Sequence, residues 1–363
     1  MEPKWQNRPV LVTGGASFIG SHLVDALVAH GADVRVVDNL SSGMLENIKQ
    51  HVQSGRVDFI LGDLLNPEIT RRAVEGMQVV FHLAADHGGR GYIAAHPVEC
   101  STNMILDGLV LRSCHQVGAE KVVFASSGCV YPVSRQMDPA EEIYLREDMV
   151  KPPYEADDLY GWAKLMTEFT LKAYHEQYGM KSAICRFFTV YGPRCGENHA
   201  VMAMIARAFL RQDPFQVWGT GEQVRNWTYI DDIVEGTILA AERIDDATAI
   251  NLGTTERIRV IDCAREVIRL AGYEAKIQTL TDKPTGPLNR VADTSLAQKV
   301  LGRQPQIMFK EGLRRTFEWY VASMDQEKVR RLLEDGALTE RKMVRAEAKA
   351  GGEAKIRQTK LNP

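Results

Sequence analysis

Short apolar runs alternate with longer amphipathic segments through the first third of the chain. Most runs consist of valine, leucine, isoleucine and phenylalanine, and each is followed by glycine or by small and polar residues. Near-continuous apolar runs of this length predict strands buried on both faces, as in a parallel sheet. Their alternation with helices predicts an α/β fold with a doubly wound parallel sheet. The predicted strands are residues 9–13, 34–37, 57–61, 79–83 and 121–125.

A glycine-rich turn follows the first predicted strand and leads into an amphipathic helix that extends to about residue 30. The turn reads Gly14-Gly-Ala-Ser-Phe-Ile-Gly20. In the order strand, turn, helix, such glycines let the backbone approach a pyrophosphate, and the free N–H groups of the helix N-terminus bind it. One position that is often glycine is Ser17, whose hydroxyl can also donate to phosphate. We therefore predict a Rossmann domain whose dinucleotide site includes Gly14, Ser17, Phe18, Ile19 and Gly20.

An acidic residue ends the second predicted strand, 18 positions beyond Gly20 (38 − 20). This residue, Asp38, lies close to the spacing of ~20 residues expected for a carboxylate that binds the adenosine ribose hydroxyls. Because an acid there repels a 2′-phosphate, NAD is favoured over NADP as the cofactor. Two interpretations remain open for Asp63, which either bonds the adenine or lies in the N-cap region of the next helix. The other residues assigned to the NAD site are Asn39, Leu64 and Ala84.

Composition and charge exclude several classes of protein. The chain has 363 residues, of which 45% are hydrophobic and 25% are charged, and its formal net charge is -3. These values are ordinary for a globular protein and give no basic excess that would favour nucleic acid. No apolar run approaches the ~18 residues that a membrane span needs, and residues 1–7 lack the apolar core of a signal peptide. We therefore expect a cytoplasmic protein with no nucleic-acid or membrane partner.

Six cysteines are scattered along the chain, with no Cys-x-x-Cys pair and no paired histidine spacing. This pattern predicts neither a disulfide framework nor a metal site. We expect five of the six to be small buried side chains. Cys129 is the exception, because it follows the fifth predicted strand at the end where ligands bind in open α/β sheets.

Tyr160 and Lys164 lie four residues apart in a predicted helix that extends through Tyr178, so both can reach the same ligand. The pKa of tyrosine is ordinarily ~10, too high for a base at neutral pH. A nearby ammonium group and a positively charged nicotinamide would favour the phenolate. Ser127 lies two residues beyond the fifth predicted strand, at the carboxyl edge of the sheet where ligands bind. Beside an NAD site, these residues indicate chemistry rather than an ordinary amphipathic helix.

The sequence from about residue 8 to residue 321 resembles the extended short-chain dehydrogenase/reductase family that acts on nucleotide sugars. The resemblance implies that Ser127, Tyr160 and Lys164 are the catalytic set. In that family the tyrosine is the base for a sugar hydroxyl while NAD takes a hydride from the same carbon. A nucleotide-diphosphate sugar is therefore the implied substrate.

The second half of the chain carries segments similar to the substrate-domain motifs of that family. Arg225 and Arg290 fall where the family holds the nucleotide diphosphate, and guanidinium is a bidentate partner for phosphate. The usual dimer surface of the family is a pair of helices, which correspond here to residues 101–117 and 160–178, so a homodimer is expected. The similar segments are Arg186-Phe-Phe-Thr-Val-Tyr-Gly-Pro193, Trp218-Gly-Thr-Gly-Glu-Gln-Val-Arg225 and Tyr229-Ile-Asp-Asp232.

We divide the chain into three parts on these grounds. Residues 1–185 form the NAD-binding Rossmann domain, which includes the helix of Tyr160. Residues 186–322 form mainly a smaller, mixed substrate-binding lobe, with some segments returning to the Rossmann domain. Residues 323–363 mix both charge signs with few large apolar side chains, which predicts a charged helical or mobile tail.

The residues after the fifth strand distinguish between the reactions of the family. In the sugar 4,6-dehydratases the end of this strand resembles Thr-Asp-Glu, whereas this chain has Ser127, Gly128 and Cys129 in the same places. Both carboxyl groups needed to eliminate water are therefore absent from this chain. Uronic acid decarboxylases tend to carry glutamate at the Cys129 place. Segments 85–93 and 126–132 instead look like the GDP-mannose 3,5-epimerases, in which a cysteine at this position is an acid/base.

Epimerisation at C3 or C5 needs two proton-transfer groups on opposite faces of the sugar. Oxidation at C4 gives a ketone that acidifies the hydrogens at C3 and C5, after which one group removes a proton and another delivers one. Cys129 can be the base if nearby positive charge favours its thiolate. The partner in the family is a lysine, and His199 falls at about its place, although an ordinary buried or surface histidine remains the alternative.

A second glycine-rich segment, residues 87–92, follows the fourth predicted strand. Its flexible backbone and its one cation predict a loop that closes over an anionic or hydroxyl-rich substrate, the alternative being a plain surface turn. We assign Gly88, Gly89 and Arg90 to substrate binding, because the segment lies at the ligand-binding edge of the sheet.

Our leading hypothesis is an NAD-dependent isomerase that epimerises a nucleotide-diphosphate sugar through a transient 4-keto intermediate, with a GDP-mannose-type 3,5- or 5-epimerase favoured. A UDP-sugar 4-epimerase acting on UDP-glucuronate or UDP-glucose is the alternative. From another class, a non-catalytic protein that binds NAD or a nucleotide sugar is disfavoured, because Ser127, Tyr160 and Lys164 are intact.

Overall fold

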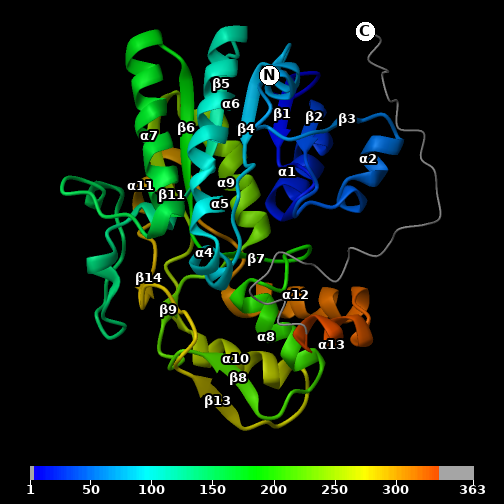
Figure 1. Ribbon diagram of the computed structural model, residues 1–363, viewed down its shortest axis with the longest axis vertical. Helices are drawn as coiled ribbons and strands as arrows, with labels where there is room; N and C mark the ends of the chain where they lie inside the picture. The colour runs from blue at the N-terminus through cyan, green and yellow to red at the C-terminus, as the bar shows by residue number, and fades with distance from the viewer. Residues whose placement is uncertain (1–3, 335–363) are drawn as a thin grey trace.

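The computed structural model describes residues 4–334 and has two parts, one above the other in Figure 1. The upper part is an open sheet whose seven strands lie in the order β11-β6-β5-β4-β1-β2-β3, with every neighbouring pair parallel. The predicted doubly wound parallel sheet is therefore confirmed. The strands are β1 Pro9–Thr13, β2 Asp33–Asp38, β3 Val57–Leu61, β4 Val79–His82, β5 Lys121–Ser127, β6 Lys181–Phe187 and β11 Asp246–Leu252.

The direction of winding reverses at β1, which lies between β2 and β4. From β1 the chain first builds outward through β2 and β3, and then outward on the other side through β4, β5 and β6. The connections that leave the carboxyl ends of β1 and β4 therefore diverge. In open α/β sheets this switch point is where a ligand binds.

Helices cover both faces of the sheet (Figure 1). Apolar side chains of α1 and α9 share one core cluster with β1, β2 and β4 on the first face. Helices α3, α6 and α7 share a second cluster with the strands on the opposite face. These helices span Phe18–Ala29 (α1), Pro67–Val74 (α3), Asn103–Val117 (α6), Asp158–Tyr178 (α7) and Ile230–Arg243 (α9).

Strand β5 is longer than the apolar run that predicts it, since it continues through Ser126 and Ser127. Both serines stay in register with β6, where they lie opposite Arg186 and Phe187. The buried hydroxyl of Ser126 donates to Glu168 at 2.5 Å, so it has a partner inside the core. A polar side chain can remain in a buried strand when it is satisfied in this way.

The lower part contains three small sheets, in which β10 pairs with β7, β9 lies between β12 and β14, and β13 pairs with β8. Their strands are β7 Val190–Tyr191, β8 Phe215–Trp218, β9 Val224–Arg225, β10 Thr228–Tyr229, β12 Ile258–Arg259, β13 Ile277–Leu280 and β14 Asn289–Arg290. The accompanying helices are α8 Ala200–Phe209, α10 Val260–Leu270, α12 Phe309–Ser323 and α13 Gln326–Glu334. Three short helices belong to the upper part: α2 Lys49–Gln53, α4 Arg90–Ala95 and α5 Pro97–Ser101.

Three segments of the second half of the chain return to the upper part. Strand β11 forms the sheet edge beside β6, and α9 covers one face. Helix α11, Ser295–Leu301, packs against both of them (Figure 1). The boundaries of 1–185 and 186–322 stay a prediction.

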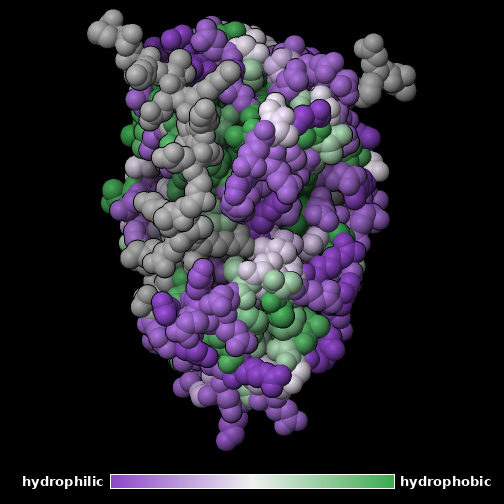
Figure 2. All heavy atoms as spheres, turned by 90° about the vertical axis from the view of Figure 1, so that its right-hand side faces the viewer, coloured by the Kyte–Doolittle hydropathy of each residue, from purple (hydrophilic) through white to green (hydrophobic). Residues whose placement is uncertain are grey.

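The predicted charged tail begins as a helix, α13, which follows α12 after a short break. Its Val329 and Leu332 are buried, so one face of α13 packs against the lobe rather than lying free in solvent. The rest of the predicted tail, residues 335–363, lies outside the described residues. Figure 2 shows the side of the molecule near β3 and α13, where hydrophilic side chains predominate and hydrophobic ones gather in the lower half. None of the helices within residues 4–334 combines the length and apolarity that a membrane crossing requires.

Candidate active site

A cavity of about 360 Å³ lies at the carboxyl ends of β1, β2, β4 and β5. It is lined by residues from the glycine turn, from the ends of these strands, from α7 and from the segment before α8. The predicted site residues that line it are Gly14, Ser17, Phe18, Ile19, Gly20, Asp38, Asn39, Asp63, Leu64, Ala84, Gly88, Ser127, Cys129, Tyr160, Lys164, His199 and Arg290. Gly89, Arg90 and Arg225 are not among the lining residues.

The glycine turn has a geometry that side chains would disturb. Gly14 has φ +69°, in the left-handed region that favours glycine. A Cβ atom on Gly20 would lie 2.2 Å from the carbonyl oxygen of Gly14, so the start of α1 packs directly against the turn. Because the turn has no side chains at these glycines, a phosphate can approach its backbone at the N-terminus of α1. This arrangement fits the pyrophosphate of NAD.

Asp38 lies at the end of β2, where its carboxylate accepts hydrogen bonds from the backbone N–H groups of Ala16 (3.0 Å) and Leu40 (2.8 Å). Burial raises the pKa of Asp38, and these hydrogen bonds act against the increase. The carboxylate is therefore fixed beside the turn, where it fits the ribose of an adenosine. The hydroxyl of Ser17 lies 3.5 Å from the same carboxylate.

Asp63 lines the cavity after β3, and its carboxylate accepts from the backbone of Leu65 at 2.9 Å. The N-cap of α3 is Asn66, whose side chain accepts from the N–H of Glu68. Asp63 therefore lies before the cap and does not itself cap the helix. Its contact with adenine stays a prediction.

Ser127, Tyr160 and Lys164 meet on one wall of the cavity because α7 begins beside the end of β5. Ser127 Oγ accepts from the N–H of Cys129 at 3.1 Å, and the Lys164 ammonium lies 5.9 Å from the centre of the Tyr160 ring. Burial raises the pKa of Tyr160, and Cys129 and Asp107 add to the increase. Burial lowers the pKa of Lys164, against the carboxylate of Asp107. A bound nicotinamide cation would act in the opposite direction on the tyrosine.

A buried polar network behind Lys164 was not predicted from the sequence. The carboxylate of Asp107 in α6 lies 3.0 Å from Nε2 of His82 and accepts from the Thr167 hydroxyl at 2.7 Å. Burial would raise the pKa of Asp107, but Lys164, His82 and Thr167 together hold it below its usual value. The signal in the sequence is an acid between the apolar positions of a predicted helix.

His199 is the N-cap residue of α8 and lines the cavity. Burial lowers the pKa of His199 to about 4, so its imidazole is neutral at neutral pH. A second histidine, His87, was not assigned to the site from the sequence. Its ring centre lies 6.0 Å from that of His199 and 6.3 Å from that of Tyr160, so His87 is a neighbour of both side chains.

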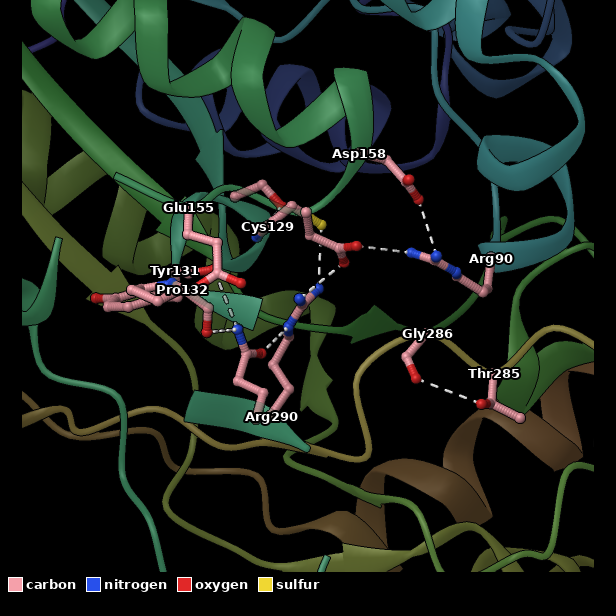
Figure 3. Close-up of polar contacts among 12 residues, drawn as sticks. Arg90, Cys129, Tyr131, Pro132, Glu155, Asp158, Thr285, Gly286 and Arg290 are labelled. Atoms are coloured by element: carbon pink, nitrogen blue, oxygen red, sulfur yellow. Dashed lines mark hydrogen bonds and ion pairs between the residues drawn. The ribbon is translucent and has the colours of Figure 1, made fainter. Parts of the chain in front are cut away.

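The three predicted substrate arginines have different surroundings. Arg290 lines the cavity and donates to Cys129 Sγ at 3.1 Å (Figure 3). Arg90 is the first residue of α4 rather than part of a loop, and it pairs with the carboxylates of Asp157 and Asp158. Arg225 donates to backbone carbonyl groups, and burial lowers its pKa to about 9. The diphosphate contacts of Arg225 and Arg290 stay a prediction.

Gly89 has a packing role that explains its place in the segment before α4. A Cβ atom there would lie 1.8 Å from the carbonyl oxygen of Asn198, the residue before His199. The glycine therefore lets the segment after β4 lie against the segment that carries His199. Gly88 contributes to the cavity itself.

Comparison with known proteins places this site in a family. A model of the NAD dependent epimerase/dehydratase family matches residues 10–253. The chain belongs to this family. The resemblance predicted from the sequence and the assignment of NAD as cofactor are both confirmed.

Relatives within the NAD-dependent epimerase/dehydratase family differ in reaction. A GDP-mannose 3,5-epimerase of Arabidopsis thaliana is 31% identical over 330 residues, which cover 90% of this chain and 85% of that protein. A UDP-glucuronic acid decarboxylase 1 of Xenopus tropicalis is 28% identical over 319 residues, which cover 88% and 73%. A solved structure of a mutant UDP-glucuronic acid 4-epimerase from Bacillus cereus, in complex with NAD and UDP-4-deoxy-4-fluoro-glucuronic acid, is 28% identical with a TM-score of 0.76, covering 85% of this chain and 98% of that chain.

Proposed function

We propose that the protein epimerises a nucleotide-diphosphate sugar through a transient 4-keto intermediate, as a GDP-mannose-type 3,5- or 5-epimerase. The observation that carries the proposal is the place of the Cys129 thiol. It lines the cavity together with Ser127 and Tyr160, and a buried guanidinium donates to its sulfur. A thiol in this place is not needed for chemistry confined to C4, but it can exchange a proton at C3 or C5.

The first step of the proposed reaction belongs to Tyr160 and its neighbours. Tyr160, as the phenolate that Lys164 and a bound nicotinamide cation would favour, accepts the proton of the C4 hydroxyl, and Ser127 orients that hydroxyl. NAD held by the turn from Gly14 to Gly20 and by Asp38 would supply the hydride chemistry needed at C4. The 4-keto group then acidifies the ring hydrogens at C3 and C5.

Cys129 and His199 carry the inversion in this proposal. Because His199 is neutral at neutral pH, it is ready to accept a proton rather than to donate one. We therefore assign proton removal to His199 and proton delivery to the S–H group of Cys129. The thiolate formed by delivery faces the guanidinium of Arg290, which stabilises it. This assignment reverses the direction favoured by the sequence, in which Cys129 was the base.

The products distinguish this function from the second candidate. Incubation with GDP-mannose should give a nucleotide sugar with inverted configuration at C5 or C3, as observed by NMR. The second candidate is a UDP-glucuronate or UDP-glucose 4-epimerase, and the similarity to the solved UDP-glucuronic acid 4-epimerase favours it. Inversion only at C4, and only with a UDP-sugar, would replace the first proposal with the second.

We also propose that two copies of the chain associate through α5, α6 and α7. Large apolar side chains are exposed on these helices, with 70% of Val98, 61% of Ile105 and 47% of Met166 accessible. Trp162 on the same helix as Met166 is also exposed. Exposed apolar side chains gathered on neighbouring helices are typical of a protein interface.

The double variant Ile105→Glu and Met166→Glu should be a monomer. In a two-fold dimer both copies would bury the two introduced carboxylates in the interface, and burial of unpaired charges is unfavourable. Size-exclusion chromatography with light scattering gives the mass directly. The matched control is Val321→Glu, which changes an exposed apolar residue on α12 and should remain a dimer. A monomeric wild-type protein, or a dimer of the double variant, would contradict the proposed interface.

A further inference from the structure

Asp157, the residue before α7, contacts Cys129 in two ways: directly through its backbone, and indirectly through a carboxylate that binds Arg290. The backbone N–H of Asp157 donates to the carbonyl oxygen of Cys129 at 2.8 Å. Its carboxylate accepts from Nη2 of Arg290 at 2.8 Å, and Nη1 of the same guanidinium donates to Cys129 Sγ at 3.1 Å. Asp157 thus holds both the backbone of Cys129 and the group that contacts its sulfur.

The guanidinium of Arg290 has little freedom in this arrangement. Its Nε donates to the side-chain oxygen of Gln136 at 2.7 Å, so Gln136, Cys129 and Asp157 together engage all three of its nitrogens. Arg290 is 9% exposed and Asp157 is 5% exposed. The bonds to Gln136 and Asp157 are buried, so water does not compete for these two donors and their geometry is well defined.

The other oxygen of the same carboxylate binds a second arginine. Arg90, at the start of α4, donates to Asp157 Oδ1 at 3.0 Å and pairs with Asp158 at 2.8 Å. In Figure 3 Arg90 and Arg290 approach the start of α7 from two sides, with Cys129 close to Arg290. One carboxylate therefore compensates two guanidinium groups and connects the segment of Gly88 and Gly89 to the thiol.

Close packing supports this geometry. A Cβ atom on Gly161 would lie 2.4 Å from the carbonyl oxygen of Cys129, so the first turn of α7 lies directly on the backbone of Cys129. The carbonyl oxygen of Asp157 accepts from the N–H of Gly161 at 3.0 Å. The backbone of Cys129 is therefore held in place by its packing against α7. Asp157 orients Arg290 toward the thiol of this fixed residue.

We propose that Asp157 is a positioning residue for proton transfer by Cys129, which acts by holding Arg290 in contact with the sulfur. The inference rests on the proposed function only in taking the thiol as an acid/base group. Two effects of the carboxylate oppose each other. Its negative charge disfavours a thiolate nearby, whereas the fixed guanidinium favours one. If positioning is its role, loss of Asp157 makes the thiol harder to ionise, although a negative charge has been removed.

The test measures the rate at which iodoacetamide alkylates Cys129 as a function of pH, by mass spectrometry of the peptide that contains it. The other five cysteines are buried, which favours reaction at Cys129. Asp157→Ala should shift the profile to higher pH, and a shift of one unit lowers the rate near neutral pH about tenfold. Asp157→Asn, which keeps an oxygen that can accept from Arg290, should shift it less. Because alkylation needs no turnover, the result is independent of whether the proposed epimerisation is correct.

Two comparisons make the result specific. Asp158→Ala removes a carboxylate one residue along the chain that contacts Arg90 but not Arg290, and it should not shift the profile to higher pH. In an Arg290→Met background, Asp157→Ala should give no further upward shift, because the group through which it acts is gone. Faster alkylation of Asp157→Ala, an unchanged profile, or an equal upward shift without Arg290 would each overturn the proposal. If Asp157→Ala fails to fold, the same criteria apply to Asp157→Asn.

Discussion

Tyr160→Phe should reduce turnover of the nucleotide sugar by roughly 10²–10⁴-fold, the usual contribution of a general acid or base. The change removes one oxygen and leaves the ring, so the wall formed by Ser127 and Lys164 should persist. NAD should remain bound, because the glycine turn and Asp38 are unaffected. Steady-state turnover and the NAD content of the purified protein measure the two effects separately.

A matched control for this variant is Tyr178→Phe, which makes the same change at an exposed position of the same helix. Turnover of this control should be unchanged. A non-catalytic protein that binds NAD or a nucleotide sugar would show no turnover with the wild type or with either variant. Full activity of Tyr160→Phe would remove the tyrosine from the mechanism.

Glu168→Ala should lower the free energy of unfolding by about 3–5 kcal/mol, because it leaves a buried arginine without its counter-ion. Glu168 and Arg186 form a two-pronged ion pair at 2.7 and 2.9 Å, and both residues are buried. Burial opposes the charge of Arg186, but Glu168 raises its pKa, so the guanidinium stays charged. Urea denaturation followed by circular dichroism measures the loss.

The control for Glu168→Ala is Asp58→Ala, which breaks a surface ion pair with Arg35. Its oxygen lies 2.7 Å from the Arg35 nitrogen, but the Asp58 side chain is 62% exposed. Loss of such a pair should cost less than about 1 kcal/mol. Equal losses in the two variants would show that burial of the Glu168 pair has no special effect on stability.

The parts of the site that the sequence predicted are those in which local spacing fixes the geometry. The turn from Gly14 to Gly20 is short enough that its conformation follows from the glycines themselves. Asp38 comes at the end of the next strand, which must lie beside β1 in a doubly wound sheet. Tyr160 and Lys164 share one helical face whatever surrounds the helix. Their meeting with Ser127 followed from the resemblance and the order of the strands.

The contacts that were missed join segments far apart in the chain, which no local pattern predicts. Arg290 was expected to bind a diphosphate, but its bonds to Gln136 and Asp157 link residues 154 and 133 positions away. Asp157 is one of several acids before α7, and nothing in its neighbours distinguishes it. His87 and Asp107 likewise gain their importance from side chains on other elements. Arg90 was predicted in a loop, because glycines on both sides conceal the start of a short helix.

Exchange of ring hydrogens with solvent tests the central claim most directly. The protein is incubated with GDP-mannose in deuterated water, and the recovered nucleotide sugar is analysed by NMR and mass spectrometry. The account predicts deuterium at C5 or C3 of the epimerised product, and loss of that product in Cys129→Ala, because the group assigned to deliver the proton is then gone. Epimerised product without deuterium at either carbon would contradict it, because inversion would then have occurred without the proton transfer assigned to Cys129 and His199.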